Sequence, residues 1–450
     1  MSDKKIFIAI FLLALFMRLG ALFSFAEEKS LIYVNDSLTY LQTAKNMTSH
    51  GVYSMEISDT PHPDNFRTPL YPFFLIPFVC LKTSKYIPAI VQILIMSLGC
   101  GLAYLLGKKI FSDRVAIFAA FLFALEPFGA LISAQIMVEA IFTPLFLSAV
   151  FSLLLYAKSA EAKYLWLASA LLSLSALARP IALPLAVFLP LAVWLAGGQR
   201  PEMIKRALWS LGIFFIILTP WLYYIFFSLK TTDFSSIVWT QGYEYRARYF
   251  DEWRAKRGAP AADRLPLADM QAVNETLDAR AIAPIKTVVS SYLNSHLAEY
   301  VVFHLLRTPY LLTDSGYSSL FNGISKLNFS YDTTHGAVSG GYLEQIGWRN
   351  LSATIYQIKN QPLFAVLLLA DLFFVFIALL ALANPLIHWR RRERPNKEII
   401  LLVLIILFYT LVASPIGNPR FRIPVNFLLF LLALDSIFLI KTPAIYDKSP

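Results

Sequence analysis

Two short segments near the start of the chain carry residue types and spacings that could do chemistry. Asp36 and Tyr40 stand four positions apart within residues 34–47, so they share one face of an expected helix. Arg67 precedes a Pro-Leu-Tyr turn that ends at Tyr71. A carboxylate can accept a proton from an attacking group, and a guanidinium can hold an anion in its planar fork. The two segments therefore point to a site that joins a general base to an anion-binding group.

Asp36 also has a purely structural interpretation. Asn35 is a good N-cap, and an acid in the first turn is favoured by the helix dipole. Leu38 and Leu41 then begin an apolar stripe suited to a helix lying on a membrane. Helix capping is enough to explain the presence of Asp36, but it does not explain the arginine-containing turn that follows in the same loop. We therefore expect Asp36 to be both a first-turn residue and a site residue.

The composition is that of a polytopic membrane protein. Of the 450 residues, 57% are hydrophobic and 15% are charged, against about 25% charged residues in soluble proteins. Cys80 and Cys100 fit no metal or disulfide framework. The net charge of +10 comes from loop lysines and arginines, so it does not indicate a nucleic-acid partner.

Apolar windows of about 20 residues predict an all-α protein with about ten transmembrane helices, in a range of nine to twelve. Residues 69–81 are apolar but short, which favours a helix at the interface. We interpret the first segment as an uncleaved span, although its charge layout also resembles a signal peptide. The expected spans are 6–25, 86–106, 115–135, 139–157, 164–178, 181–197, 207–228, 363–387, 399–414 and 421–440.

The distribution of lysine and arginine predicts a cytoplasmic N-terminus, because basic clusters such as 390–394 fall on that side. The opposite side then holds two long loops. We divide the chain into a module at 1–228, whose outer loop 26–85 carries two interfacial helices, a loop region at 229–362, and C-terminal helices at 363–450. Most of the mass outside the membrane is thus expected on the outer face.

Charged groups at membrane depth need a partner or a task. Glu139 and Arg179 fall at the outer ends of spans, near Asp36, and both could be site residues. Alternatively, Glu139 is an acid that interacts with the dipole at the start of a helix. Arg179 is then an arginine at a span end whose charged group reaches the membrane surface. Glu126 precedes a proline, which favours a structural role. The remaining charged groups, expected to pair between helices or lie near the interface, are Arg18, Asp371 and Asp435.

The order of these features resembles the GT-C superfamily of membrane glycosyltransferases. Within it, the chain is similar to the PMT-like branch, which includes protein O-mannosyltransferases and the aminoarabinose and galacturonosyl transferases of lipid A. The resemblance covers residues 1–230 and the late motif Asn-Pro-Arg-Phe-Arg-Ile-Pro at 418–424. Residues 230–360 match no part of it.

The resemblance implies a role for each matching residue. Asp36 would be the catalytic base, Glu139 a second acid of the site, and Tyr40 the tyrosine of the base motif. The remaining substrate- and phosphate-binding residues would be Arg67, Tyr71, Arg179, Arg420 and Arg422. A single acid at the first site argues against an obligatory divalent metal, and no other cofactor is implied.

The implied reaction is inverting transfer of a hexose or pentose from a polyprenyl-phosphate donor. The acceptor would be a protein, lipid A or a cell-surface glycan at the outer face of a bacterial inner membrane, and residues 229–362 would select it. We expect the membrane surface to raise the pKa of Asp36 and residues 61–88 to form the groove for the isoprenoid tail. The alternatives are a transporter or flippase of lipid-linked sugars, a polymerase or ligase of lipid-linked glycans, and a non-enzymatic assembly partner. The sequence leaves the sugar, the acceptor, the prenyl length and the oligomeric state open.

Overall fold

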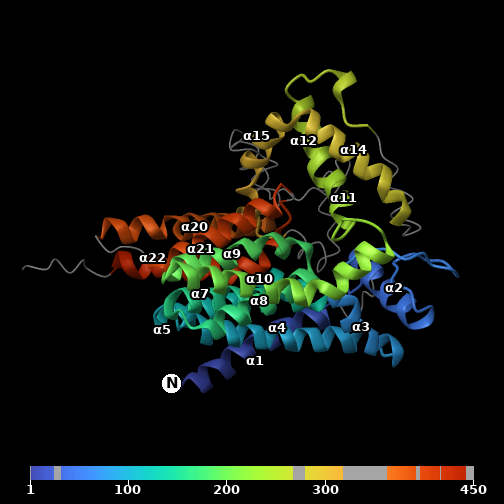
Figure 1. The fold of residues 1–450 in the computed structure, drawn as a ribbon. Coiled ribbons are helices and arrows are strands. Elements are labelled where there is room, and N and C mark those ends of the chain that lie inside the picture. Colours follow the sequence, from blue (N-terminus) through green and yellow to red (C-terminus); the bar gives the residue numbers. More distant parts are fainter. Residues whose placement is uncertain are drawn as a thin grey trace, which may run out of the picture.

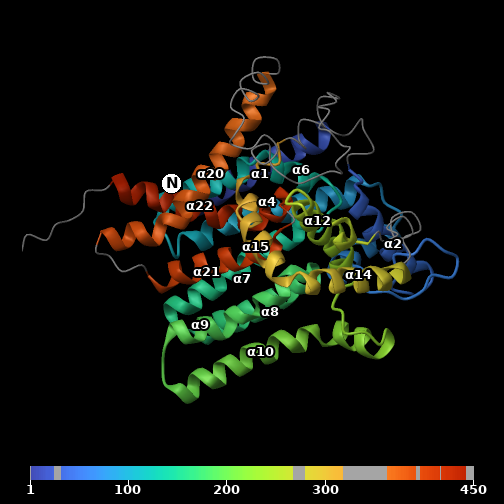
Figure 2. The ribbon, with the colours of Figure 1, turned by 90° about the horizontal axis from the view of Figure 1, so that it is seen from above.

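The computed structural model describes residues 2–24, 32–266, 279–317, 362–391, 396–415 and 417–441. Within these residues every regular element is helical. Long helices run side by side in a bundle, and shorter ones gather at one of its ends and along one side (Figures 1 and 2). We call the end that carries α2 (Asn35–Ser49) and α3 (Leu70–Cys80) the cavity end.

The bundle is built from α1 (Asp3–Ser24), α4 (Tyr86–Gly107), α5 (Asp113–Leu125), α6 (Pro127–Ala134), α7 (Glu139–Ser159), α8 (Ala162–Ala178), η1 (Pro180–Val187), α9 (Phe188–Ala196), α10 (Arg200–Tyr223), α20 (Pro362–Arg390), α21 (Lys397–Ala413) and α22 (Ile423–Lys441). The other elements are η2 (Tyr224–Ser228), α11 (Ile237–Gln241), η3 (Gly242–Ala247), α12 (Arg248–Ala255), η4 (Ala261–Asp263), η5 (Ala279–Ala281), α14 (Ile282–Ser295), α15 (Leu297–Arg307), α16 (Tyr310–Thr313) and η7 (Pro419–Phe421).

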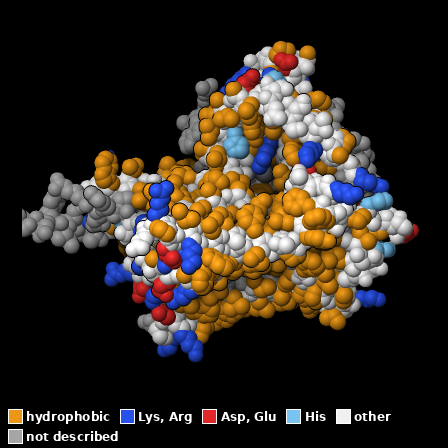
Figure 3. All heavy atoms as spheres, viewed as in Figure 1, with side chains coloured by type: hydrophobic (Ala, Val, Ile, Leu, Met, Phe, Trp, Pro, Cys, Tyr) orange, Lys and Arg blue, Asp and Glu red, His pale blue; other side chains and the backbone are white. Residues whose placement is uncertain are grey.

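The described helices are those of a multi-pass membrane protein. Six are long and apolar enough to cross a membrane, or seven if α5 and α6 form one bent span. Hydrophobic side chains cover the flank of the bundle, and charged side chains gather toward its ends (Figure 3). All ten expected spans fall on helices, but α8, the η1–α9 unit and α21 are short. The number of spans therefore stays a prediction, and the expected interfacial helix at 69–81 is α3.

The span expected at 115–135 is formed by two helices, α5 and α6, with a bend between them. The chain bends by 53° between α5 and α6, because Pro127 has no N–H to continue the helix. The Glu126 carboxylate caps the new helix, accepting hydrogen bonds from the backbone N–H groups of Phe128 at 3.0 Å and Gly129 at 2.6 Å. The structural role favoured for Glu126 is thereby confirmed.

The other charged groups at membrane depth also find partners. Arg18 of α1 is fully buried and donates hydrogen bonds to the carbonyls of Ala14 and Ala124 and to Cys100 Sγ. The Asp371 carboxylate accepts a hydrogen bond from the Ser315 N–H at 2.8 Å. Asp435 of α22 pairs with Asn384 and His388 of α20. As expected, these groups join segments to one another.

Small residues let α4 lie close to two neighbours. A Cβ on Gly99 would meet Pro144 Cγ of α7 at 2.7 Å, and one on Gly101 would meet the Phe7 ring of α1 at 2.6 Å. Interfaces of this kind bring helix backbones together where lipid removes the hydrophobic drive to associate. Close packing of α1, α4 and α7 gives the cavity end a fixed base.

A second apolar core joins the two long loops. Met55 and Phe66 of the first loop pack with Ile237, Phe250 and other apolar residues of the second. Within the first loop, the Asp64 carboxylate accepts hydrogen bonds from the N–H groups of Met55 at 2.7 Å and Phe66 at 2.8 Å. This arrangement fixes the segment that leads directly into Arg67.

Candidate functional site

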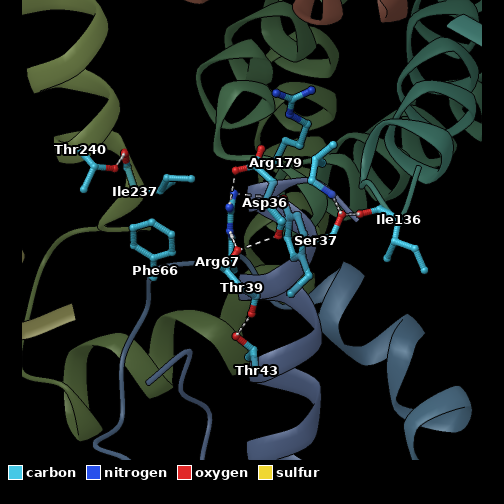
Figure 4. A network of polar contacts seen from close by, with 12 residues as sticks. Asp36, Ser37, Thr39, Thr43, Phe66, Arg67, Ile136, Arg179, Ile237 and Thr240 are labelled. Atoms are coloured by element: carbon cyan, nitrogen blue, oxygen red, sulfur yellow. Dashed lines mark hydrogen bonds and ion pairs between the residues drawn. The ribbon is translucent and has the colours of Figure 1, made fainter. Parts of the chain in front are cut away.

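The start of α2 is tied to the link between α6 and α7. Val34 is the N-cap, in extended conformation, so the expectation that Asn35 caps this helix is wrong. The Ser37 hydroxyl accepts a hydrogen bond from the Val34 N–H at 3.1 Å and donates one to the Ile136 carbonyl at 2.8 Å (Figure 4). Asp36 is therefore anchored a short distance from the start of α7, where Glu139 stands.

Arg67 lies against the same face of α2. Its Nη2 is 2.7 Å from Asp36 Oδ1, and its Nε donates to the Thr39 hydroxyl at 2.8 Å (Figure 4). The guanidinium also stands over the Tyr40 ring, 4.4 Å from its centre. The Tyr53 hydroxyl donates to the Arg67 carbonyl at 2.9 Å. Side chain and backbone are thus held from three sides, which fixes the direction of the guanidinium.

Arg420 approaches Asp36 from a distant part of the chain. It lies in η7, which begins after α21 and is capped by the Asn418 side chain. Arg420 Nη1 is 2.7 Å from Asp36 Oδ2, and its Nε is 3.5 Å from Glu139 Oε1. Arg179 Nη1 contacts the same Glu139 oxygen at 2.9 Å. The two carboxylates are therefore linked through arginines into one continuous network.

This network lines a cavity of about 220 Å³ at the cavity end of the bundle. Four arginines face two carboxylates there, which leaves a net charge of +2 on the lining. Among the described residues, Glu139 Oε2, Arg246 Nε and Arg420 Nε are buried without a hydrogen-bond partner. Buried polar atoms of this kind call for an explanation, such as a ligand. The charged lining residues are Asp36, Arg67, Glu139, Arg179, Arg246 and Arg420.

The pKa of Asp36 differs from the expectation. Burial alone would raise it, but the guanidinium groups of Arg67 and Arg420 outweigh burial and hold the pKa well below its ordinary value. The expectation of a raised pKa is therefore wrong, because it considered the membrane surface and not the two cations. In this arrangement Asp36 is an ion-paired carboxylate.

Two of the expected site residues lie outside the cavity lining. The Tyr71 hydroxyl donates to Gln92 Oε1 at 2.7 Å, and its ring packs edge-on against Tyr40. Arg422 is fully buried among backbone carbonyls on the far side of η7. The structure thus brings together Asp36, Tyr40, Arg67, Glu139, Arg179 and Arg420, and any role of Tyr71 and Arg422 passes through their neighbours.

The sequence did not single out Arg246 or Thr39. Arg246 lies in η3 of the second loop and reaches the cavity, with its Nη2 3.4 Å from the Val412 carbonyl. No motif marks it, because its placement depends on how the second loop packs over α21. Thr39 orients Arg67; its position three residues after Asp36 is the only signal that could have found it.

A family model described as dolichyl-phosphate-mannose-protein mannosyltransferase matches residues 62–224. The matched region contains Arg67, Glu139 and Arg179, and it stops before Arg246 and Arg420. The match supports a GT-C type of membrane glycosyltransferase that uses a lipid-linked sugar. A search of curated proteins found no match.

Proposed function

We propose that this chain is an integral-membrane glycosyltransferase that moves a sugar from a polyprenyl-phosphate donor to an acceptor, with inversion at the anomeric carbon. One observation carries the proposal: a carboxylate, Asp36, sits between two arginines in a cavity whose lining has a net charge of +2. The arrangement places a proton acceptor, Asp36, directly beside the arginines that can bind an anion. The proposed branch is the PMT-like one that includes the lipid A sugar transferases.

The arginines suit the phosphate of the donor. Arg420 and Arg246 both line the cavity, and the Nε of each is buried without a hydrogen-bond partner in the described part of the chain, although Arg420 Nε lies 3.5 Å from Glu139 Oε1. Phosphate gains negative charge as the bond to the sugar breaks, and fixed cations stabilise that change. Arg67 and Arg420 are held in place before the donor arrives, which avoids a cost of reorganisation during the reaction.

Asp36 becomes a stronger base when the donor is bound. Its pKa is held down by Arg67 and Arg420, and a phosphate that shares these cations weakens their hold on the carboxylate. The acceptor O–H or N–H then gives its proton to Asp36 while the acceptor atom attacks the anomeric carbon. The bond from that carbon to the phosphate oxygen breaks, and polyprenyl phosphate leaves with the electron pair.

The prenyl tail is better accommodated at the seam between η1 and α21 than in the segment at 61–88. The apolar part of the cavity is formed by Pro180 and Ile181 of η1 with Val412 and Ala413 of α21. Further along the same elements, Leu185 and Ile405 line a narrow apolar crevice. A chain leaving the phosphate can follow this seam toward the membrane interior. The segment at 61–88 instead contributes to a separate groove.

The orientation of the chain follows from the same proposal. The cavity end faces the outside of a bacterial inner membrane, and the N-terminus is cytoplasmic, as the distribution of basic residues favours. The second loop covers the cavity through Gln241 and Arg246, which supports a part for it in acceptor selection. The acceptor is a protein, lipid A or a surface glycan.

The proposal is tested with the full chain in lipid vesicles and radiolabelled polyprenyl-phosphate sugars, each supplied with candidate acceptors. Transfer with inverted configuration is expected for the wild type, and loss of transfer for Asp36→Asn, which should stay folded but melt at a lower temperature because Arg67 and Arg420 lose their carboxylate. Undiminished turnover of that variant would remove Asp36 as base. A parallel arm with pyrophosphate-linked donors tests the ligase alternative, which the four arginines also suit; transfer from those donors alone would replace the proposed reaction.

A further inference from the structure

A second cavity lies beside the first, between α2 and α3. It has a volume of about 640 Å³, and its walls include Leu41, Phe78 and Val79. We call it the α2–α3 groove. Exposed apolar side chains continue from its edge, among them Leu81 at 75% exposure and Ile57 at 63%. A groove with such a rim is suited to contact with lipid, since soluble proteins rarely leave large apolar patches uncovered.

Helix α2 separates this groove from the charged cavity. Asp36 and Tyr40 are four positions apart and share one face, whereas Leu41 and Lys45 share the opposite face, given the turn of 100° per residue. The first pair lines the charged cavity and the second lines the groove. The groove is therefore a site of its own rather than an extension of the first cavity.

The groove combines its apolar wall with a one-sided charge. Among the described residues, its lining includes Lys45, Lys82 and Lys85 and no acidic residue. Lys85 Nζ stands 5.5 Å from the ring centres of Tyr33 and Tyr86. Lys45 and Lys82 are exposed, and neither side chain has a hydrogen bond or ion pair within the described residues. This charge is complementary to an anion attached to an apolar chain.

The backbone at Lys82 adds an independent observation. Lys82 follows the end of α3 with φ at +47°, in the left-handed region. The Lys82 N–H donates to the Val79 carbonyl, and the Thr83 N–H donates to the Phe78 carbonyl. This closing pattern normally carries glycine, because a Cβ is disfavoured there. Strained residues of this kind gather at functional sites, and the residue placed here carries an amino group into the groove.

We propose that the α2–α3 groove binds an anionic glycerophospholipid. The phosphate lies among Lys45, Lys82 and Lys85, and an acyl chain lies against Leu41 and Phe78. Free phosphate does not suit the site, because most of its lining is apolar. The prenyl-phosphate donor does not suit it either, because Asp36 and the four arginines lie on the other side of α2. A bound phospholipid would hold α2 against α3, and so help to position Asp36, which lies on the opposite face of α2.

The test measures binding of phosphatidylglycerol to the full chain in nanodiscs of phosphatidylcholine. Each lysine near an anionic lipid contributes roughly a fivefold factor in affinity, so Lys45→Gln/Lys82→Gln should weaken binding roughly 25-fold. The matched control is Lys163→Gln/Lys205→Gln, which removes the same charge from exposed positions at the other end of the bundle. Equal retention by both double variants, or equal loss, would overturn the proposal.

Lys82→Gly separates binding from folding. It removes the charge and also relieves the left-handed strain, so its melting temperature in phosphatidylcholine should rise while its affinity for phosphatidylglycerol falls about fivefold. A rise in melting temperature without loss of affinity would contradict the site. Displacement of phosphatidylglycerol by polyprenyl phosphate at equal concentration would assign the groove to the donor instead. Sugar transfer by these variants in phosphatidylcholine is a separate readout, so failure of the lipid site and failure of the proposed transfer are distinguishable.

Discussion

Arg420 and Arg422 stand two positions apart, and their surroundings differ in kind. Arg420 pairs with Asp36 in the cavity, and its Nε has no hydrogen-bond partner within the described residues. Arg422 is fully buried, and its guanidinium lies 3.5 Å from the centre of the Phe374 ring. The groups that accept hydrogen bonds from Arg422 are the carbonyls of Leu312, Asp314 and Ser315 and the side chain of Asn426. One arginine pairs with carboxylates that line the cavity, whereas the other uses its donors to hold the second loop on the bundle.

Two aspartates of the first loop repeat this contrast. Asp36 contacts two arginines at the wall of a cavity, and its pKa lies below the ordinary value. Asp64 faces backbone N–H groups in a closed turn, and burial raises its pKa to about 6 even though those hydrogen bonds favour the charged form. Asp36 is thus ion-paired at the wall of a cavity that a ligand can enter, whereas Asp64 is held by backbone groups that fix a turn.

The largest effects are expected from matched substitutions of the two arginines. Arg422→Gln leaves the carbonyls of the second loop, and the buried carboxylates of Glu126 and Asp371 that interact with Arg422 electrostatically, without their cation, so it should cost about 3–5 kcal/mol of stability. Arg420→Gln should cost less stability, because Asp36 and Glu139 keep their contacts with Arg67 and Arg179, and it should lower kcat by about 10²–10³. Thermal melting and transfer assays on both purified variants measure the two outcomes. A folded, inactive Arg422 variant beside an unfolded Arg420 variant would reverse the assignment.

The next effect concerns Asp64. A carboxyl whose pKa is raised on folding stabilises the protein fully below its unfolded pKa of about 3.9, and that stability is lost as the pH rises through the folded pKa. With a folded pKa of about 6, the contribution between pH 4 and pH 6 amounts to about 2–3 kcal/mol. The melting temperature should therefore be higher at pH 5 than at pH 7. Asp64→Asn should lose this difference, and the exposed Asp59→Asn should keep it.

A smaller effect is expected at Arg246. It lines the cavity from the second loop with one guanidinium nitrogen unpartnered among the described residues. A hydrogen bond to a charged ligand is worth about 1.5–3 kcal/mol, so Arg246→Gln should raise the donor KM at least tenfold without a change in melting. The matched control is Arg248→Gln, two positions further on and exposed. Equal KM values for the two variants would remove Arg246 from the donor site.

The sequence predicts which residues form this site better than it predicts the role of each residue. The Asp36–Tyr40 spacing and the turn at Arg67 are local patterns, and the residues lie where those patterns suggest. The choice between Arg420 and Arg422 depends on the second loop, which shows no local pattern and supplies the carbonyls that bind Arg422. The sign of the Asp36 pKa shift depends on Arg67 together with Arg420, and Arg420 is almost 400 positions away. Helical periodicity likewise predicts α5 and α6 but not the 53° bend between them.

The smallest effect, and the sharpest test of the contrast, is the pH dependence of Asp36. The kcat/KM profile reports groups of the free enzyme, and kcat reports those of the complex with substrate. The two arginines depress the pKa of Asp36 in the free protein, so kcat/KM should show no acid limb from this group between pH 7 and pH 5. If the donor phosphate draws those cations away, the pKa of Asp36 is higher in the complex than in the free protein. As the pH is lowered, kcat should therefore begin to fall at a higher pH than kcat/KM does. Arg420→Gln should bring an acid limb into kcat/KM as well, because one of the two cations is gone, whereas Arg246→Gln, which does not pair with Asp36, should not. An identical acid limb in both parameters of the wild type would mean that Asp36 is not released by the donor.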